Sequence, residues 1–364
     1  MSKKVLIIQR VLTRYRYELL QELAPQVLKL GFVTSQGEEN GTLKTFIPDD
    51  QKYNNIDIYK LKALKLNYKG ESRGTSLFLY PQVLKIIQKY DTIVLEGTTN
   101  LFNNIYIIPL AKIMGKKIIW WDAGYSLTVR TLKRKLIDKV VYPLIKMTDT
   151  QFAYSTKAKK YMENYMGASN CQLLLNTINT EYFESIKEEI LENIKNKKID
   201  PKKIKLLYVG AIEERKKIKD LIDIVIKNNQ ENSRQFHLTV VGSGEYLKYL
   251  KSYIADKNID FVVFTGAIYD KEKLKQYYFN ADLFVLPGDG GLGILQSLLY
   301  GLPAVCTAAD GTEEDYMDKK YILNNMEDLK DINIKDIVDF NYSDLLNKVK
   351  KNLFINRFLK EIHA

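Results

Sequence analysis

The residues best placed to do chemistry form a glycine-rich turn in the second half of the chain. The turn reads Pro287-Gly288-Asp289-Gly290-Gly291-Leu292-Gly293, and it lies between an apolar run typical of a strand and a run of helical period. Four glycines at the carboxyl end of a strand remove side chains, so backbone N–H groups and the positive end of the next helix can approach an anion or a sugar hydroxyl. A simple turn rarely needs four glycines, and we therefore predict that this loop binds a ligand through its main chain.

A pair of cations upstream of this turn is the second candidate. Arg215 and Lys216 follow a predicted strand, 206–209, and precede a helix whose apolar positions recur from Ile218 to Ile226. We expect both cations at the start of that helix, at the carboxyl edge of the sheet, where open α/β sheets bind ligands. Cations oppose the dipole at that end of a helix but suit a bound diphosphate, and we predict that they neutralise its charge during catalysis. A solvated basic run is the alternative.

The segment from Ala281 to Pro303 contains the glycine-rich turn and resembles the donor-binding segment of glycosyltransferase family 4, whose members have the GT-B fold and transfer sugars with retention. The resemblance implies two glutamates separated by seven residues, at positions that hold Gly288 and Gln296 in this chain. Members with a Pro-Gly-x-Gly-Gly-Leu loop also lack the first glutamate. A neutral group forms hydrogen bonds worth about 0.5 to 1.5 kcal/mol, against about 1.5 to 3 kcal/mol for a charged one. We therefore expect Gln296 to weaken or alter donor binding.

The same resemblance implies the rest of a site for the donor, a nucleotide diphosphate sugar. The family carries an arginine near Ala211 and a lysine that matches Lys216, both on the donor diphosphate, and Arg215 is the expected substitute for the missing arginine. Backbone from Gly266 to Ile268 would contact the nucleotide base. The donor-binding residues expected from the glycine turns and the resemblance are Gly210, Gly242, Gly266, Ala267, Ile268, Gly288, Asp289, Gly290, Gly291, Leu292 and Gln296.

Candidates for the acceptor side lie in the first half of the chain. Glu96 and Asp122 each end a predicted strand, and either carboxylate could act as a catalytic base, bind an acceptor hydroxyl, or only cap a helix or turn. Similar enzymes often carry a His-Gly pair where this chain has Asp122-Ala123-Gly124-Tyr125, and its two histidines, His237 and His363, lie elsewhere. The segment Arg14-Tyr15-Arg16 resembles the arginine-bearing segment that opens many such transferases. The expected acceptor-side residues are Arg14, Tyr15, Arg16, Gly124 and Tyr125.

The elements that must position these residues alternate along the chain. Short runs rich in Val and Ile alternate with stretches of helical period, which is typical of βαβ units and parallel sheets. The predicted strands are 5–8, 92–95, 117–120 and 150–153, followed by 206–209, 238–241, 262–265, 283–286 and 304–306. A chain of 364 residues is too long for one ordinary core, because single cores seldom grow beyond about 250 to 300 residues.

We therefore predict an α/β protein of GT-B fold, with two facing Rossmann-like domains and a central cleft. The expected domains are an N-terminal acceptor domain over residues 1–180, a nucleotide-sugar donor domain over residues 181–344, and a C-terminal helix over residues 345–364. That helix is amphipathic and could pack back on the first domain.

Charge and composition limit the partners. Lys and Arg number 55 against 44 Asp and Glu, a net charge of +11, which suits phosphates, anionic lipids or nucleic acid. No module of base-stacking aromatics among lysines is found, and we predict no nucleic-acid binding. The segment Arg130 to Lys146 pairs apolar residues, among them Leu132, Leu136 and Val141, with lysines. It is either a helix at an anionic membrane surface or an ordinary helix with a solvated face.

Two cysteines and the lack of an apolar run of membrane-spanning length predict a cytoplasmic protein, with peripheral binding at the inner face of the plasma membrane as a further alternative.

The expected reaction moves a sugar from a nucleotide diphosphate sugar to a hydroxyl of a saccharide or lipid-linked saccharide acceptor. The resemblance implies retention and a role in making cell-surface polysaccharide or glycolipid. No Asp-x-Asp pair is present, so we expect no metal, and no cofactor besides the nucleotide sugar as co-substrate. A weak or inactive nucleotide-sugar-binding paralogue that acts as a partner subunit is the alternative.

Overall fold

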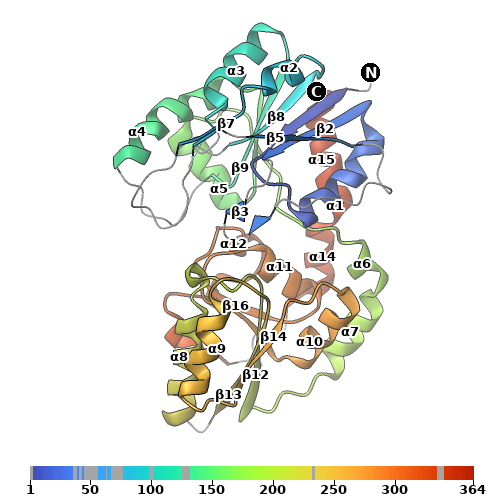
Figure 1. The fold of residues 1–364 in the computed structure, drawn as a ribbon. Coiled ribbons are helices and arrows are strands. Elements are labelled where there is room, and N and C mark those ends of the chain that lie inside the picture. Colours follow the sequence, from blue (N-terminus) through green and yellow to red (C-terminus); the bar gives the residue numbers. More distant parts are fainter. Residues whose placement is uncertain are drawn as a thin grey trace. The chain divides into compact units, whose positions relative to one another are not determined.

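The computed structural model describes residues 3–35, 39–40, 43–44, 56–62, 64–66, 77–97, 102–124, 132–231, 234–333 and 340–364. The chain forms two compact units, each with its own parallel sheet (Figure 1). The first unit comprises Met1–Asn179 and Lys351–Ala364, and the second comprises Thr180–Lys350. The segment predicted as one piece, residues 345–364, is thus divided between the two units.

A seven-stranded sheet forms the centre of the first unit, and every neighbouring pair of its strands is parallel. In spatial order the strands are β11 (Cys171–Leu173), β10 (Thr150–Ala153), β9 (Lys117–Asp122), β8 (Thr92–Glu96), β1 (Lys4–Ile8), β2 (Lys29–Ser35) and β5 (Ile56–Leu61). The chain starts in the middle at β1 and proceeds outward to β2 and β5, and from β8 it proceeds outward the other way. The carboxyl ends of β1 and β8 therefore flank the point where the order reverses, which is the usual ligand site of such sheets.

Helices cover both faces of this sheet. Alternate side chains of a strand point to opposite faces, so Leu6 and Ile8 join one apolar core while Val5 and Ile7 join the other. The first core includes residues of α2 (Val83–Ile87), α3 (Asn104–Ile113), α4 (Leu132–Val141), the 3-10 helix η2 (Tyr142–Met147), α5 (Thr156–Tyr161) and the π-helix η3 (Met162–Met166). The second includes residues of α1 (Arg14–Leu23), the 3-10 helix η1 (Ala24–Gln26) and α15 (Lys351–His363). Two short antiparallel pairs also belong to this unit, β3 (Glu39–Asn40) with β4 (Leu43–Lys44) and β6 (Leu64–Leu66) with β7 (Leu77–Leu79).

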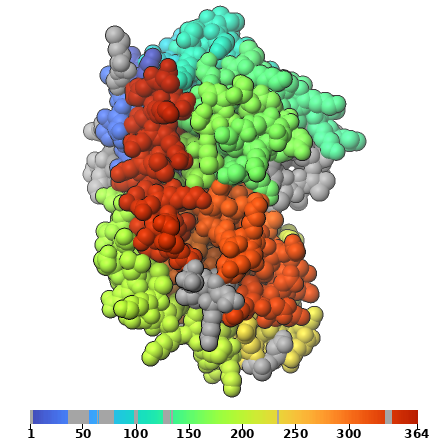
Figure 2. Space-filling view, turned by 180° about the vertical axis from the view of Figure 1, so that it is seen from behind, coloured from blue at the N-terminus to red at the C-terminus, as the bar shows by residue number. Residues whose placement is uncertain are grey.

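Helix α15 completes the core of the first unit although it comes from the far end of the chain. Phe354 and Phe358 place their rings 5.9 and 5.6 Å from the ring of Trp121, and Phe358 lies 5.3 Å from Phe152. Figure 2 shows this helix in red against the N-terminal segment of the unit. The first unit therefore depends on residues from both ends of the sequence.

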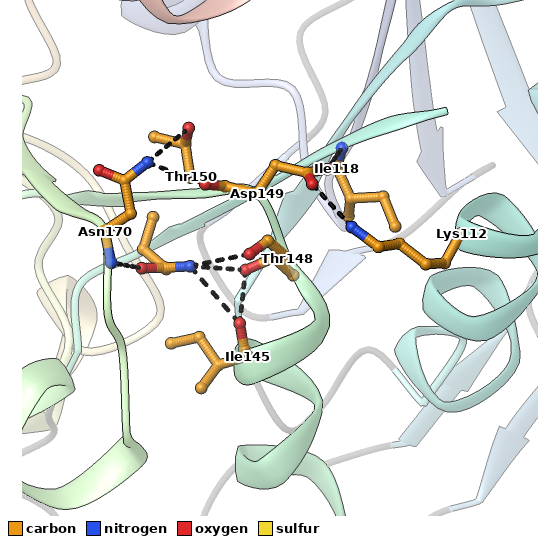
Figure 3. Close-up of polar contacts among 8 residues, drawn as sticks. Lys112, Ile118, Ile145, Thr148, Asp149, Thr150 and Asn170 are labelled. Carbon is orange, nitrogen blue, oxygen red and sulfur yellow. Dashed lines mark hydrogen bonds and ion pairs between the residues drawn. The ribbon is translucent and has the colours of Figure 1, made fainter. Parts of the chain in front are cut away.

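A network of polar contacts joins η2 to the edge of the same sheet (Figure 3). The carboxylate of Asp149 accepts a hydrogen bond from the backbone of Ile118 at 2.8 Å and pairs with Lys112 of α3 at 2.7 Å. The side chain of Gln151 donates to the hydroxyl of Thr148 at 2.9 Å and accepts from the backbone of Asn170 at 2.9 Å. These bonds fix the end of η2 relative to β9, β10 and β11.

The second unit contains a six-stranded parallel sheet. In spatial order its strands are β14 (Val262–Gly266), β13 (Gln235–Val241), β12 (Lys203–Val209), β15 (Leu283–Leu286), β16 (Ala304–Thr307) and β17 (Ile322–Leu323). Its helices are α6 (Glu181–Ser185), α7 (Lys187–Asn196), α8 (Ile218–Glu231), α9 (Leu247–Asp256), α10 (Lys271–Asn280), α11 (Leu292–Leu299), α12 (Glu313–Tyr316) and α14 (Tyr342–Val349), with 3-10 helices η4 (Glu214–Lys216), η5 (Lys319–Tyr321) and η6 (Met326–Asp331). The strand order reverses between β12 and β15, so their carboxyl ends flank the point of reversal.

The predicted strands are all present. The sequence pattern does not predict β2, β5, β11 and β17 of the two parallel sheets, or the short strands β3, β4, β6 and β7. The single predicted helix near the C-terminus is wrong, because Lys350 has an extended backbone with ψ of 135° and separates α14 from α15. Within the described residues, no helix combines the length and the apolar character needed to cross a bilayer.

Candidate functional site

The glycine loop, which we define as residues 287–291, connects the end of β15 to the start of α11. Strand β15 pairs with β12, so the loop lies beside the segment that follows β12. A side chain at Gly288 would place its Cβ 2.6 Å from the backbone oxygen of Arg215 and 2.9 Å from the carbonyl carbon of Lys216. The glycine is required because the two backbones approach too closely for a side chain.

Lys216 extends into the glycine loop. Its ammonium donates a hydrogen bond to the backbone oxygen of Asp289, and it lies 3.2 Å from the position that a Cβ at Gly290 would take. Gly290 has a φ of +139°, which a residue with a side chain rarely adopts. The structure therefore brings together the lysine and the glycine turn on which the sequence-based hypothesis depends.

The ammonium of Lys216 is poorly solvated. Burial lowers its pKa to about 8, and the nearby guanidinium of Arg215 acts in the same direction. An anion beside this group would favour the charged form and raise the pKa again. The charges of Asp289, Glu213 and Asp310 oppose the lowering of this pKa but do not cancel it.

Arg215 is held between two carboxylates. Its Nε lies 2.6 Å from the buried Glu213, and its Nη1 lies 3.4 Å from Asp289 of the glycine loop. The prediction that both cations begin the helix is wrong, because they lie in the separate turn η4 and Lys217, with a φ of +53°, precedes α8.

Backbone donors at the start of α11 face no protein acceptor. Among the described residues, no hydrogen bond is made by the N–H groups of Asp289, Gly290 and Gly291. The N–H groups in the first turn of a helix lack intrahelical partners and favour negative charge. Leu292 is the first residue of α11 and Gln296 lies one turn later, partly exposed. These N–H groups and Lys216 lie close together, with the carboxylates of Asp289 and Asp310 beside them.

A third loop supports the glycine loop, and sequence reasoning missed it. A Cβ at Gly291 would collide with the hydroxyl of Thr312, whose backbone N–H donates to Asp310 at 3.1 Å. The buried carboxylate of Glu313 accepts from the backbone of Ala309 at 3.0 Å and of Gly311 at 2.7 Å, and burial raises its pKa. This loop follows β16, the neighbour of β15, so only the strand order could have indicated its proximity.

The remaining donor-side candidates form a row across the ends of β12, β13 and β14. Gly210 donates to Val241 at 3.0 Å, and Gly242 donates to Gly266 at 2.9 Å. No atom lies within 4 Å of the position that a Cβ at Gly266 would take, so this turn is open. Ala267 is exposed, and Ile268 is partly exposed beside a hollow of about 450 Å³ that Lys273, Gln276, Tyr277 and Asn280 complete. That hollow includes no residue of the glycine loop.

In the first unit, Glu96 is fully engaged by Arg10 across the point where the strand order reverses. Its carboxylate accepts the backbone N–H of Arg10 at 2.7 Å and the guanidinium Nε at 2.8 Å, with Nη2 also 2.7 Å away. The oxygens of this carboxylate are thus already occupied by Arg10. The geometry therefore favours the other candidate, Asp122.

Asp122 ends β9, the neighbour of β8. Burial raises its pKa to about 6, and the charge of Glu96 adds to the rise, while the backbone N–H groups of Gly124 and Ala123 oppose it. Gly124 has a φ of +79° and packs against the backbone of Ala158. An aspartate with this pKa changes its charge close to neutral pH.

The three residues of the arginine segment have different surroundings. Arg16 is buried with its guanidinium 4.0 Å from the ring of Trp121, and it donates to Tyr154 at 3.3 Å and Asn176 at 3.4 Å. Tyr15 lies 5.3 Å from the same guanidinium. Arg14 is exposed on α1 and pairs with Glu18 at 3.2 Å. Tyr125, the last acceptor-side candidate, lies outside the described residues.

Comparison with known proteins identifies the class to which this architecture belongs. Residues 189–331 match the family model for glycosyl transferases group 1. The uncharacterised glycosyltransferase MJ1069 of Methanocaldococcus jannaschii is 26% identical over 350 residues, which cover 88% of this chain and 87% of the relative. The solved structure of Anabaena HepE in complex with UDP and glucose matches with a TM-score of 0.68 at 13% identity over 100% of both chains. TarM of S. aureus matches with a TM-score of 0.62 at 10% identity, also over 100% of both chains.

The fold is the GT-B fold, as predicted from the sequence. The family match and the archaeal relative support a glycosyltransferase, and the matched segment contains Arg215, Lys216 and the whole glycine loop.

Proposed function

We propose that the protein transfers a sugar from a nucleotide diphosphate sugar to an acceptor hydroxyl, with retention of the anomeric configuration, in the biosynthesis of cell-surface polysaccharide or glycolipid. One observation carries the proposal. The poorly solvated ammonium of Lys216 lies where β12 and β15 end, together with the backbone N–H groups of Asp289, Gly290 and Gly291, which make no hydrogen bond within the described part of the chain. A diphosphate would supply acceptor oxygens for these N–H groups and further negative charge beside Lys216.

The proposed chemistry requires stabilisation of a leaving group. The bond between the anomeric carbon and the donor diphosphate breaks, and its electron pair goes to the diphosphate oxygen. The acceptor oxygen bonds to the same carbon, and its proton passes to a base, for which Asp122 is the candidate. Lys216, Arg215 and the loop amides would stabilise the developing charge through donors that are already in position. The solved structure of Anabaena HepE is a complex with UDP and glucose, which supports a nucleotide-sugar donor.

On the acceptor side, Asp122 is our candidate for the group that binds or deprotonates the hydroxyl. Its raised pKa and its place at a carboxyl end next to β8 support this role, whereas Glu96 is held by Arg10. Gln296 stands where the family has a glutamate for the donor ribose, and its neutral amide predicts modest donor affinity.

Titration of Lys216→Ala against UDP, GDP and ADP by calorimetry tests the proposal. We expect one of the three to bind the unmodified protein at pH 7, and the substitution to weaken it by about 10- to 100-fold, because a hydrogen bond to a charged group contributes about 1.5 to 3 kcal/mol. Lys227→Ala is the control, since Lys227 is an exposed lysine of α8 in the same unit. Equal affinity of the Lys216 variant and the unmodified protein would refute the proposed site.

Turnover distinguishes the transferase from the binding subunit. The corresponding nucleotide sugar should be consumed in the presence of a saccharide or lipid-linked saccharide acceptor, and NMR of the product should show the donor's anomeric configuration. Inversion of the anomeric configuration would contradict the proposed retention but not the proposed sugar transfer. Tight binding without transfer or hydrolysis across a broad acceptor panel would instead favour the inactive paralogue that the departure at Gln296 allows.

A further inference from the structure

Helix α4 exposes a row of large apolar side chains. Leu132, Leu136 and Val140 are 80%, 63% and 57% exposed, and their spacing of four residues places them on one side of the helix. Lys135 and Lys139, which are also exposed, form the adjacent row. We call these five residues the outer face of α4. The sequence pattern places Leu132, Leu136 and Val140 on one face with Val141, whereas in the structure Val141 is buried and the other three are exposed.

The opposite side of α4 already fills the core. Val141 is fully buried and Ile137 packs against the same apolar core. An ordinary surface helix has one apolar stripe and a polar opposite side. Here the helix is apolar on two sides, so the apolar residues of the outer face have no role in the fold of the first unit.

Packing and hydrogen bonds hold α4 and η2 against the rest of the first unit. Helix α4 continues directly into η2, and the network around Thr148, Asp149 and Gln151 ties the end of η2 to three strands of the sheet (Figure 3). Thr148 also donates to the backbone oxygen of Ile145 at 2.6 Å. The exposure of the three apolar side chains is therefore a property of a packed helix.

The charge of α4 indicates what kind of surface could bind its outer face. The one acidic residue of the helix, Asp138, is only 7% exposed, so the outer face presents apolar side chains and ammonium groups without an exposed carboxylate. Two copies of the outer face would bring their lysines together, which opposes a symmetric dimer through it. Neighbouring α3 adds exposed apolar residues of its own, Ile113 at 82% and Met114. A surface that is apolar and anionic at once would match these features.

We propose that the outer face of α4 docks on a lipid bilayer that contains anionic headgroups. Leu132, Leu136 and Val140 would enter the boundary between headgroups and acyl chains, while Lys135 and Lys139 remain among the phosphates. Each basic residue near an anionic surface contributes about 1 kcal/mol, or about fivefold in affinity. This binding is separate from sugar transfer, and the loss of either would leave the other proposal standing.

Co-sedimentation of the full chain with vesicles tests this proposal. One set of vesicles is pure phosphatidylcholine and the other contains one third phosphatidylglycerol. We expect binding to the anionic vesicles only, with a decrease as salt is raised. Lys135→Ala with Lys139→Ala should weaken binding by about 25-fold, and Leu132→Ser with Leu136→Ser should abolish it.

Matched variants outside α4 provide the controls. Lys248→Ala with Lys251→Ala removes two exposed lysines of α9, and Leu28→Ser with Val263→Ser removes two exposed apolar side chains. Both control variants should bind as the unmodified protein does, and all variants should keep its circular dichroism and melting temperature. The proposal is overturned if the unmodified protein stays in the supernatant, or if the α4 variants bind the anionic vesicles unchanged. It is also overturned if sedimentation velocity shows a dimer that Leu136→Ser dissociates while vesicle binding is absent.

Discussion

Lys216 and Asp122 are charged groups in surroundings that favour their neutral forms. Burial lowers the pKa of Lys216 from 10.5 to about 8 and raises the pKa of Asp122 from 3.8 to about 6. The folded chain thus binds fewer protons at Lys216 than the unfolded chain between pH 8 and 10.5, where stability rises with pH. It binds more at Asp122 between pH 3.8 and 6, where stability falls as pH rises. Groups that reduce stability in this way are typical of functional sites.

Asp122→Asn should therefore separate stability from activity. At pH 7 the substitution removes a buried charge, so the melting temperature should rise or stay unchanged. If Asp122 acts on the acceptor, kcat/KM of the unmodified protein should increase as pH rises through about 6. The variant should lose that dependence and fall about 10- to 100-fold, the value of a hydrogen bond to a charged group. Asp256→Asn, an exposed aspartate of α9, is the control. If kcat/KM of the Asp122→Asn variant still rises with pH through about 6, Asp122 is not the group that acts on the acceptor.

At the scale of elements, α15 closes one face of the first sheet through Phe354 and Phe358. Phe358→Ala should lower the free energy of unfolding of the first unit by about 3 to 5 kcal/mol, the usual cost of emptying a buried phenylalanine site. Trp120 and Trp121, the two tryptophans of the chain, both lie in β9, so the change in their fluorescence with urea reports on this unit. Asn356→Ala, an exposed position of α15, should change the midpoint little. A small effect of Phe358→Ala would mean that α15 is dispensable for this core.

The sequence predicts those elements whose residues form a recognisable local pattern, and it misses those that depend on the order of the strands. Buried parallel strands are continuous Val and Ile runs, so most were found, whereas β2 carries Gly31 and polar residues and was not. The glycine loop was found because its composition reveals close backbone contact. Asp310 was missed because its place beside Gly291 follows from the order of β15 and β16, which no local pattern encodes. The sequence pattern did not separate the exposed row of α4 from the buried Val141, because the apolar residues extend around both sides of the helix.

For the whole molecule, two units with separate sheets should respond separately to a ligand of one of them. A nucleotide diphosphate at about 100 times its dissociation constant should add about 2.7 kcal/mol to the stability of the unit that binds it. We expect calorimetry to show a transition that moves upward with the nucleotide, while the midpoint from tryptophan fluorescence stays in place. A single transition that moves as one by both methods would show that the units unfold together and would contradict this expectation.

The position of α15 also has a consequence for how the protein is made. The half that leaves the ribosome first lacks its last helix until the 171 residues of Thr180–Lys350 have been added. At roughly 5 to 20 residues per second, that interval is about 10 to 35 s. During it the nascent chain carries an apolar sheet surface around Trp121 and Phe152 with no helix over it. That patch is where a chaperone would be expected to bind, and the domain begun first is the one that matures last.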